Sequence, residues 1–182
     1  DPGDRDILSK LNGKNISAIL LTHCHDDHAC GVQALREKFD CQLLMSEDEL
    51  EFHNMGGSLS EFLDMEGFTL EPDIIVSSQK EALTIDGVAM EAYLLPGHTP
   101  GGLAFYYEAH LFCGDLIFKD SIGRTDFFGG DMAQMSASLR KVAELFPGET
   151  VILPGHMEIT ELGKELKYNQ ILKEVMADDK LF

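Results

Sequence analysis

Basic residues are scarce in this sequence, and acidic residues are abundant. Only 14 of the 182 residues are lysine or arginine, against 32 aspartates and glutamates, which gives a formal net charge of −18. A surface with this charge repels phosphate backbones at long range. Nucleic acid is therefore excluded as an expected partner.

Long apolar runs and a cysteine framework are missing as well. No stretch approaches the roughly 18 consecutive apolar residues of a membrane span, and the opening residues DPGDRDILSK are polar where a secretory signal is apolar. We expect a cytoplasmic protein that does not enter a membrane, although the chain begins with Asp1 rather than Met and anything that preceded it is not seen. The cysteines show no CxxC spacing, which favours reduced thiols over disulfides at Cys24, Cys30, Cys41 and Cys113.

What the sequence does contain is an alternation of short strands and helices. A chain of 182 residues that is 44% apolar can bury one sizeable core, so we expect a single domain over residues 1–182. Apolar runs predict strands at 17–22, 41–45, 81–85, 88–95, 103–107, 111–114 and 150–153, with an antiparallel meander from 81 to 114. Helical spacing predicts helices at 29–39, 46–50, 132–146 and 158–177, which makes the fold class α/β.

Two of these helices have recognisable N-caps. Ser46 stands before a short helix with Glu49 three residues later, which is the capping-box pattern. Asp131 stands directly before the helix at 132–146 and is its expected cap.

The densest group of polar side chains is in ILLTHCHDDHACG, residues 19–31. His23 and His25 lie two apart at the end of a predicted strand, so their imidazoles leave the same face and can bind one ion. Asp27 and His28 follow where the chain turns into a helix, and a second ion becomes possible there. The alternative is a polar loop in which Asp26 or Asp27 only caps the helix. The cost of burying so many competing polar groups without a cation favours the metal site.

Three further polar residues follow the ends of apolar strands. His98 lies in LLPGHTPGG, Asp115 in LFCGDLIF and His156 in VILPGHM. One such residue more often satisfies a turn. Because loops at strand ends collect ligands from distant parts of a chain, three of them together with the histidine cluster predict convergence on one site.

The order HCHDDH, PGHT, GD and PGH resembles the metallo-β-lactamase superfamily. The stretches GDLIFKDSIGRTDFFGGD and PGHMEITELGKELKYNQ resemble, more closely, the short bacterial type II glyoxalase-like (hydroxyacylglutathione hydrolase-like) hydrolases, and the resemblance runs from about residue 1 to residue 172. It implies an αββα four-layer sandwich, with two mixed β-sheets face to face, helices on the outer faces and a metal pair in a groove at one edge.

The resemblance also implies the ligands and the reaction. Zn²⁺ suits the mixed nitrogen and oxygen ligands best, with Fe or Mn possible. Two cations about 3.5–4 Å apart would hold a shared water as hydroxide near pH 7, which would cleave a small-molecule thioester or ester. Asp27 and Asp115 would take part in catalysis, and the protein would be a monomer or homodimer. One metal would be bound by His23, His25 and His98, the other by Asp27, His28 and His156, and Asp115 would bridge them.

Arg124, in SIGRTD, has two interpretations. It can face the groove and bind an anionic substrate, or it can pair with Asp126 or Asp120 and fix the loop. His53 and His110 lie outside every motif and are expected to be surface or hydrogen-bonded histidines. Cys24 points away from its neighbouring histidines by strand alternation and is expected to pack in the core.

The sequence departs from the family pattern at three places. Only 26 residues follow His156, too few for the C-terminal extension that binds glutathione in longer type II glyoxalases. Met157 stands where a glycine is common. The family also has two or three strands before the DPG turn with which this chain starts, so we expect that these N-terminal strands are lacking and that one sheet has a bare edge.

Other functions remain possible for the same residues. A mononuclear iron persulfide dioxygenase would use His23, His98 and Asp115 as a facial triad, although PGH at residues 154–156 disfavours it. A lactonase or β-lactamase would keep the two-metal chemistry. A nuclease of this fold is disfavoured by the charge of −18, and a non-catalytic scaffold would have no use for all seven ligands.

Overall fold

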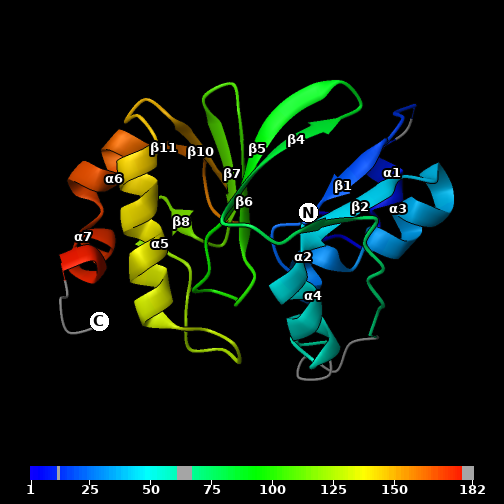
Figure 1. Cartoon of the computed structure of the whole chain (residues 1–182), viewed down its shortest axis with the longest axis horizontal. Coiled ribbons are helices and arrows are strands. Elements are labelled where there is room, and N and C mark those ends of the chain that lie inside the picture. Colours follow the sequence, from blue (N-terminus) through cyan, green and yellow to red (C-terminus); the bar gives the residue numbers. More distant parts are fainter. Residues whose placement is uncertain (12, 61–66, 178–182) are drawn as a thin grey trace.

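The computed structural model describes residues 1–11, 13–60 and 67–177, and it has two main β-sheets with helices on both outer sides (Figure 1). The smaller sheet contains β1 (Ala18–Leu20), β2 (Gln42–Ser46) and β3 (Ile74–Val76), and both of its pairings are parallel. The helix predicted at 29–39 is present as α3 (Val32–Phe39), and the strand predicted at 41–45 is present as β2.

The larger sheet has the strand order β11-β10-β7-β6-β5-β4. Its first four strands in the chain, β4 (Lys80–Ile85), β5 (Val88–Leu94), β6 (Leu103–Tyr107) and β7 (His110–Gly114), pair antiparallel in sequence, which confirms the predicted meander. The strand β10 (Val151–Pro154) joins β7 in parallel, and β11 (Thr160–Glu161) pairs antiparallel with β10. This sheet is therefore mixed.

Successive side chains of the strands pack on opposite faces of each sheet, and this alternation produces the four layers of the sandwich. Leu43 and Met45 pack toward the helices beside the smaller sheet, whereas Leu44 between them faces the other sheet. In the same way Ala92 lies between the sheets, and its neighbour Tyr93 packs against the helices beside the larger sheet. Because successive side chains of a strand point to opposite faces, two sheets buried on both sides give three apolar interfaces and the αββα sandwich.

The helices divide between the two outer sides. Beside the smaller sheet lie α1 (Ile7–Lys10), α2 (Asp26–Ala29), α3 and α4 (Glu47–Asn54), and beside the larger sheet lie α5 (Met132–Leu145), α6 (Leu162–Tyr168) and α7 (Gln170–Ala177) (Figure 1). Both predicted caps are present, because the side chains of Ser46 and Asp131 accept hydrogen bonds from the backbone N–H groups of Glu49 and Gln134.

The predicted helix at 158–177 is interrupted. Residues 160–161 form β11, and the helix that follows is divided at Asn169, whose backbone is extended at ψ 105°. The Asn169 side chain accepts from the Leu172 backbone N–H, so it caps the start of α7, and its amide donates to the carbonyls of Phe118 and Ser121. A sequence pattern with helical spacing does not register such a cap when its partners come from a distant hairpin.

That hairpin and two short helices were not predicted. The strands β8 (Ile117–Phe118) and β9 (Ser121–Ile122) pair antiparallel just after Asp115. The helices α1 and α2 have four residues each, too short for a periodic signal.

Three strands of the smaller sheet face the six strands of the larger one. Within the described residues β1 pairs only with β2, and a groove of about 590 Å³ opens beside it between the sheets. Apolar residues of both sheets line this groove, and its far end reaches Asp27 and His28. The inner face of β7 is partly open as a result, with Phe112 44% exposed.

The four cysteines form no disulfide bond with one another in the structure. Cys24 is fully buried in the core beside the smaller sheet, which confirms its predicted packing. In the part of the chain that the structure describes, no helix has the length and apolar character needed to span a bilayer.

Candidate metal centre

The histidine cluster lies at the carboxyl end of β1. The strand ends at Leu20, two buried residues follow, and the chain then turns through His23 and His25 into the single turn of α2, which carries Asp27 and His28. The His25 backbone is extended at φ −58° and ψ 149°, so it ends the strand-like segment and stands at the N-cap position of α2. The sequence therefore presents the first four polar side chains from a rigid strand end and a short helix.

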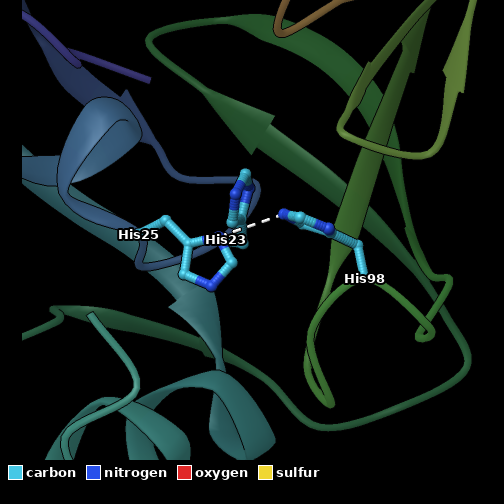
Figure 2. Close-up of side chains that lie close together, drawn as sticks. All are labelled: His23, His25 and His98. Atoms are coloured by element: carbon cyan, nitrogen blue, oxygen red, sulfur yellow. Dashed lines mark hydrogen bonds between the residues drawn. The ribbon is translucent and has the colours of Figure 1, made fainter. Parts of the chain in front are cut away.

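A first group of three histidines comes together from two distant segments. His23 and His25 meet His98, which lies in the loop after β5, and one nitrogen of each ring lies within 4.8 Å of the others (Figure 2). The Nε2 of His98 lies 3.0 Å from Nδ1 of His25, and the centroids of the His23 and His98 rings are 4.9 Å apart. All three side chains are buried.

A second group lies beside it. His28 on α2 faces His156 in the loop after β10, with their Nε2 atoms 3.3 Å apart, and the Asp27 carboxylate lies 3.1 Å from Nε2 of His156. Asp27, His28 and His156 can place three ligand atoms within 4.8 Å of one another. This group is the more open one, since the side chains of His156 and Asp27 are 46% and 58% exposed.

Asp115 lies between the two groups. Its Oδ1 is 3.4 Å from Nε2 of His28, and its Oδ2 is 3.5 Å from Nε2 of His98 and 3.6 Å from Nε2 of His156. One carboxylate therefore touches members of both groups. The structure brings together all seven of the residues that the resemblance implies as ligands.

The site also has polar atoms that the protein leaves unsatisfied. Among the described residues, the buried Nε2 atoms of His23 and His25 and the Oδ1 of Asp115 make no hydrogen bond. Gly155 is packed so closely that a Cβ there would lie 2.4 Å from Asp115 Oδ1 and 2.5 Å from Cε1 of His28. Buried nitrogen and oxygen atoms that lack protein partners are groups that a bound cation can satisfy, and the His25 nitrogen that faces His98 is Nδ1.

Burial sets the protonation state of these groups. It lowers the pKa of His23 and His98 and takes the pKa of His25 to about 3. Burial acts to raise the pKa of Asp115, but the close approach of His28, His98 and His156 outweighs this effect, so that its pKa lies below the usual value. Neutral imidazoles and an ionised carboxylate are the forms that bind metal.

Two oxygens that sequence reasoning did not identify orient the imidazoles. The Asp1 carboxylate lies 3.0 Å from Nδ1 of His28 and accepts from the backbone and hydroxyl of Thr22. The Arg124 carbonyl lies 2.7 Å from Nδ1 of His98. Metal-binding histidines commonly donate their second N–H to such an acceptor, which fixes the ring and its tautomer. A backbone carbonyl such as that of Arg124 leaves no signal in the sequence. Asp1, in contrast, belongs to the DPG turn, which the sequence shows.

The Arg124 side chain is already paired. Its Nε and Nη2 donate to the Asp126 carboxylate at 2.6 and 2.7 Å, and the guanidinium carbon lies 3.8 Å from the centroid of the Phe127 ring. Both partners of the ion pair are more than half exposed. Met157, directly after His156, is 64% exposed and has a left-handed backbone with φ 65°.

The two histidines outside the motifs lie apart from the seven residues. Nδ1 of His110 lies 2.7 Å from the Glu108 carbonyl, and the His53 ring stacks on Phe68. Neither belongs to a group of potential ligands among the described residues.

A family model for the metallo-beta-lactamase superfamily matches residues 2–156, most of the chain. The chain belongs to the metallo-β-lactamase superfamily. The match spans every strand from β1 to β10 and all seven of the converging residues.

Relatives in this superfamily cover most of the chain as well. It is 32% identical over 164 residues to the hydroxyacylglutathione hydrolase GloC of Haemophilus influenzae, which covers 87% of this chain and 76% of that protein. Among solved structures, BLEG-1 B3 metallo-beta-lactamase is 34% identical with a TM-score of 0.85, covering 94% of this chain and 86% of the other. The di-iron-bound form of TTHA1623 is 32% identical with a TM-score of 0.80, covering 93% and 86%. Superfamily members are metal-dependent hydrolases, and a dinuclear site is their common feature.

Proposed function

We propose that this protein is a binuclear metal-dependent hydrolase that cleaves a thioester. The observation that carries the proposal is the placement of Asp115 between two groups of three potential ligands, within 3.4–3.6 Å of His28, His98 and His156. A mononuclear dioxygenase would need only the triad of His23, His98 and Asp115, with open positions on its metal. The second group therefore favours two metals.

The residues divide into two sets of roles. His23, His25 and His98 would hold one ion with neutral imidazoles, and all three side chains are buried. The more exposed second group lies where a substrate can arrive from solvent. Two divalent cations would supply a Lewis acid for the carbonyl and would lower the pKa of a coordinated water. We propose Zn²⁺, while iron is the metal named for the di-iron-bound form of TTHA1623.

We propose that Asp27 handles a proton. Its carboxylate is exposed on the open side of the site, and one oxygen lies 3.1 Å from Nε2 of His156. The other oxygen can therefore face an attacking water and orient it or accept its proton. Asp115, which touches both groups, would keep the two ligand sets at a fixed separation.

The thioester is proposed from the relatives together with the site. The curated relative GloC is named a hydroxyacylglutathione hydrolase, and the sequence similarity extends over 87% of this chain. Arg124, bound to Asp126 on the rim, is the proposed contact for an anionic part of the substrate after exchange of partners. We also propose a cytoplasmic location, in which the four free thiols remain reduced.

A second candidate reaction is β-lactam hydrolysis. It is favoured by the similarity to BLEG-1, a B3 metallo-beta-lactamase, at 34% identity and a TM-score of 0.85. The same ligands would serve, because a strained amide and a thioester both need a polarised carbonyl and an activated water. Comparing the rates on a thioester and on a β-lactam separates the two reactions.

The test combines metal content with substrate assays. Purified protein should contain two equivalents of divalent metal and hydrolyse S-lactoylglutathione or a simple thioester faster than nitrocefin. His23→Ala should lower the rate by more than about 100-fold, beyond the 10- to 100-fold typical of an outer-shell partner. His110→Ala, outside the site, should keep both metals and activity. One equivalent of iron with oxygen consumption would instead identify a dioxygenase.

A further inference from the structure

Glu49 is a carboxylate with no exposed surface, and it lies outside both ligand groups. It is in the first turn of α4, and the capping-box pattern predicts that its carboxylate turns back to the Ser46 backbone. In the structure it instead accepts three hydrogen bonds from elsewhere: from the Cys24 backbone N–H at 2.8 Å, the Thr99 hydroxyl at 2.7 Å and the Gly101 backbone N–H at 3.0 Å.

These donors belong to the two loops that supply the first group of histidines. Cys24 stands between His23 and His25, and Thr99 directly follows His98. Oε1 of Glu49 binds the first loop, and Oε2 binds the second. A single carboxylate therefore spans two segments that are about 75 residues apart in the chain and that meet at the three histidines.

The surroundings of Glu49 are built for this bridge. The Ser46 hydroxyl, which caps α4, also donates to the Gly101 carbonyl at 2.6 Å. Together with the two bonds of Glu49, the start of the helix makes three hydrogen bonds to the His98 loop. Gly101 approaches so closely that a Cβ there would lie 2.1 Å from the Glu49 backbone nitrogen. The first turn of a helix favours a negative charge.

The ionised form of Glu49 is the one that satisfies its partners. Two of the three are backbone N–H groups, which can only donate, and an ionised carboxylate accepts from all three without an O–H of its own to place. Burial raises the pKa of Glu49, and the hydrogen bonds from Cys24, Thr99 and Gly101 act against that rise.

We propose that Glu49 is a positioning residue that holds the loops of His23, His25 and His98 at the separation required for metal binding. The proposal rests on the metal site of the proposed function. The second group, Asp27, His28 and His156, makes no hydrogen bond to Glu49 among the described contacts. Loss of the bridge should therefore weaken one metal site and spare the other.

Glu49→Gln tests the bridge with almost no change in shape. A glutamine has one acceptor oxygen, so its NH₂ group must face either the Cys24 or the Gly101 N–H, and one loop is released. We expect affinity for one of two Zn²⁺ or Co²⁺ equivalents to fall roughly 10- to 100-fold, as for other outer-shell partners, with the second unchanged. Chelator competition measures both, and the Co²⁺ absorption spectrum reports the altered coordination.

Glu165→Gln is a matched control. Glu165 is 3% exposed and also accepts three hydrogen bonds, from the Asp120 backbone, the Thr160 hydroxyl and the Asn169 amide, on the far side of the larger sheet. Both variants lose hydrogen bonds to a buried carboxylate, so both should melt at a lower temperature. Only Glu49→Gln should lose affinity for metal.

A milder pair of variants covers the case in which Glu49→Gln does not fold. Thr99→Val removes one donor with little change in volume, and Thr99→Ser keeps it. We expect Thr99→Val to weaken one metal site and Thr99→Ser to bind both as the wild type does. Wild-type affinity in Glu49→Gln or in Thr99→Val would overturn the proposal. A wild-type protein that binds two metals but cleaves no thioester would overturn the proposed function and leave the role of Glu49 intact.

Discussion

Close packing around single residues decides whether the seven side chains can converge. Gly155 precedes His156, and its hydrogen atom occupies the space where any Cβ would meet Asp115 and His28. Its backbone N–H donates to the Gly114 carbonyl at 2.9 Å, which ties the His156 loop to the Asp115 loop. The absence of a side chain at this one position thus lets two ligand loops touch.

Gly155→Ala is therefore expected to damage the metal site. The added methyl group must displace Asp115 or His28, because contacts of 2.4 and 2.5 Å cannot persist. We expect at least a tenfold loss of metal affinity, measured by chelator competition, with a corresponding fall in hydrolysis.

Gly148→Ala is the control for this substitution. A Cβ at Gly148 would meet only Gly163, at 3.5 Å, which is an ordinary van der Waals contact. If Gly155→Ala binds metal as tightly as Gly148→Ala does, the proposed ligand roles of Asp115 and His28 are wrong.

At the scale of elements, the helices beside the larger sheet stabilise the fold without supplying ligands. The long helix α5 packs Met135, Leu139 and Val142 into the core against the larger sheet. Its N-terminus begins at Asp131, whose side chain accepts from Gln134 N–H at 2.9 Å. The Asp131 backbone N–H also donates to the Gly97 carbonyl, next to His98, at 2.9 Å. A substitution of the Asp131 side chain removes the cap and keeps this backbone bond.

Asp131→Ala should lower stability and leave metal binding unchanged. Loss of an aspartate N-cap costs about 1 kcal/mol, which lowers the free energy of unfolding by that amount. Asp131→Asn, whose amide oxygen still caps the helix, should remain near the wild type. Chemical denaturation measures the difference, and a loss of bound metal in Asp131→Ala would show that α5 does more than stabilise the sandwich.

At the scale of the whole molecule, the protonation of the buried histidines links stability to pH. In the metal-free fold, burial keeps the pKa of His23, His25 and His98 below the ordinary value of about 6.5. Below pH 6.5 the unfolded chain therefore binds protons that the folded chain does not. The free energy of unfolding is fully retained above pH 6.5 and falls as the pH drops toward the folded pKa, which for His25 is about 3.

The metal-free protein should consequently lose stability on acidification. Each histidine that stays neutral in the fold costs about 1.4 kcal/mol at one pH unit below 6.5. Thermal unfolding in the presence of chelator, at pH 7.5, 6.5 and 5.5, measures this loss. His25→Gln should show a smaller loss over the same range, and an equal loss in both proteins would contradict the assignment to these histidines.

The sequence by itself determined the local elements and the types of ligand. Strand alternation, turn residues and caps predicted the meander from β4 to β7 and the start of α5 at Asp131, because these depend on neighbours a few residues away. The order of the histidines and aspartates pointed to the metallo-β-lactamase superfamily. The positions of His98, Asp115 and His156 after strands predicted which side chains would converge.

Only the tertiary structure decided how distant segments meet. The local pattern around Glu49 predicts a reciprocal cap on the Ser46 backbone N–H. Its carboxylate instead binds two loops that fold against α4, where it accepts three hydrogen bonds in place of one. Asn169 divides the helix predicted at 158–177, and its amide binds two carbonyls that lie about 50 residues away in the chain. Hydrogen bonds between segments far apart in sequence leave no periodic signal, so their partners become known only when the chain is folded.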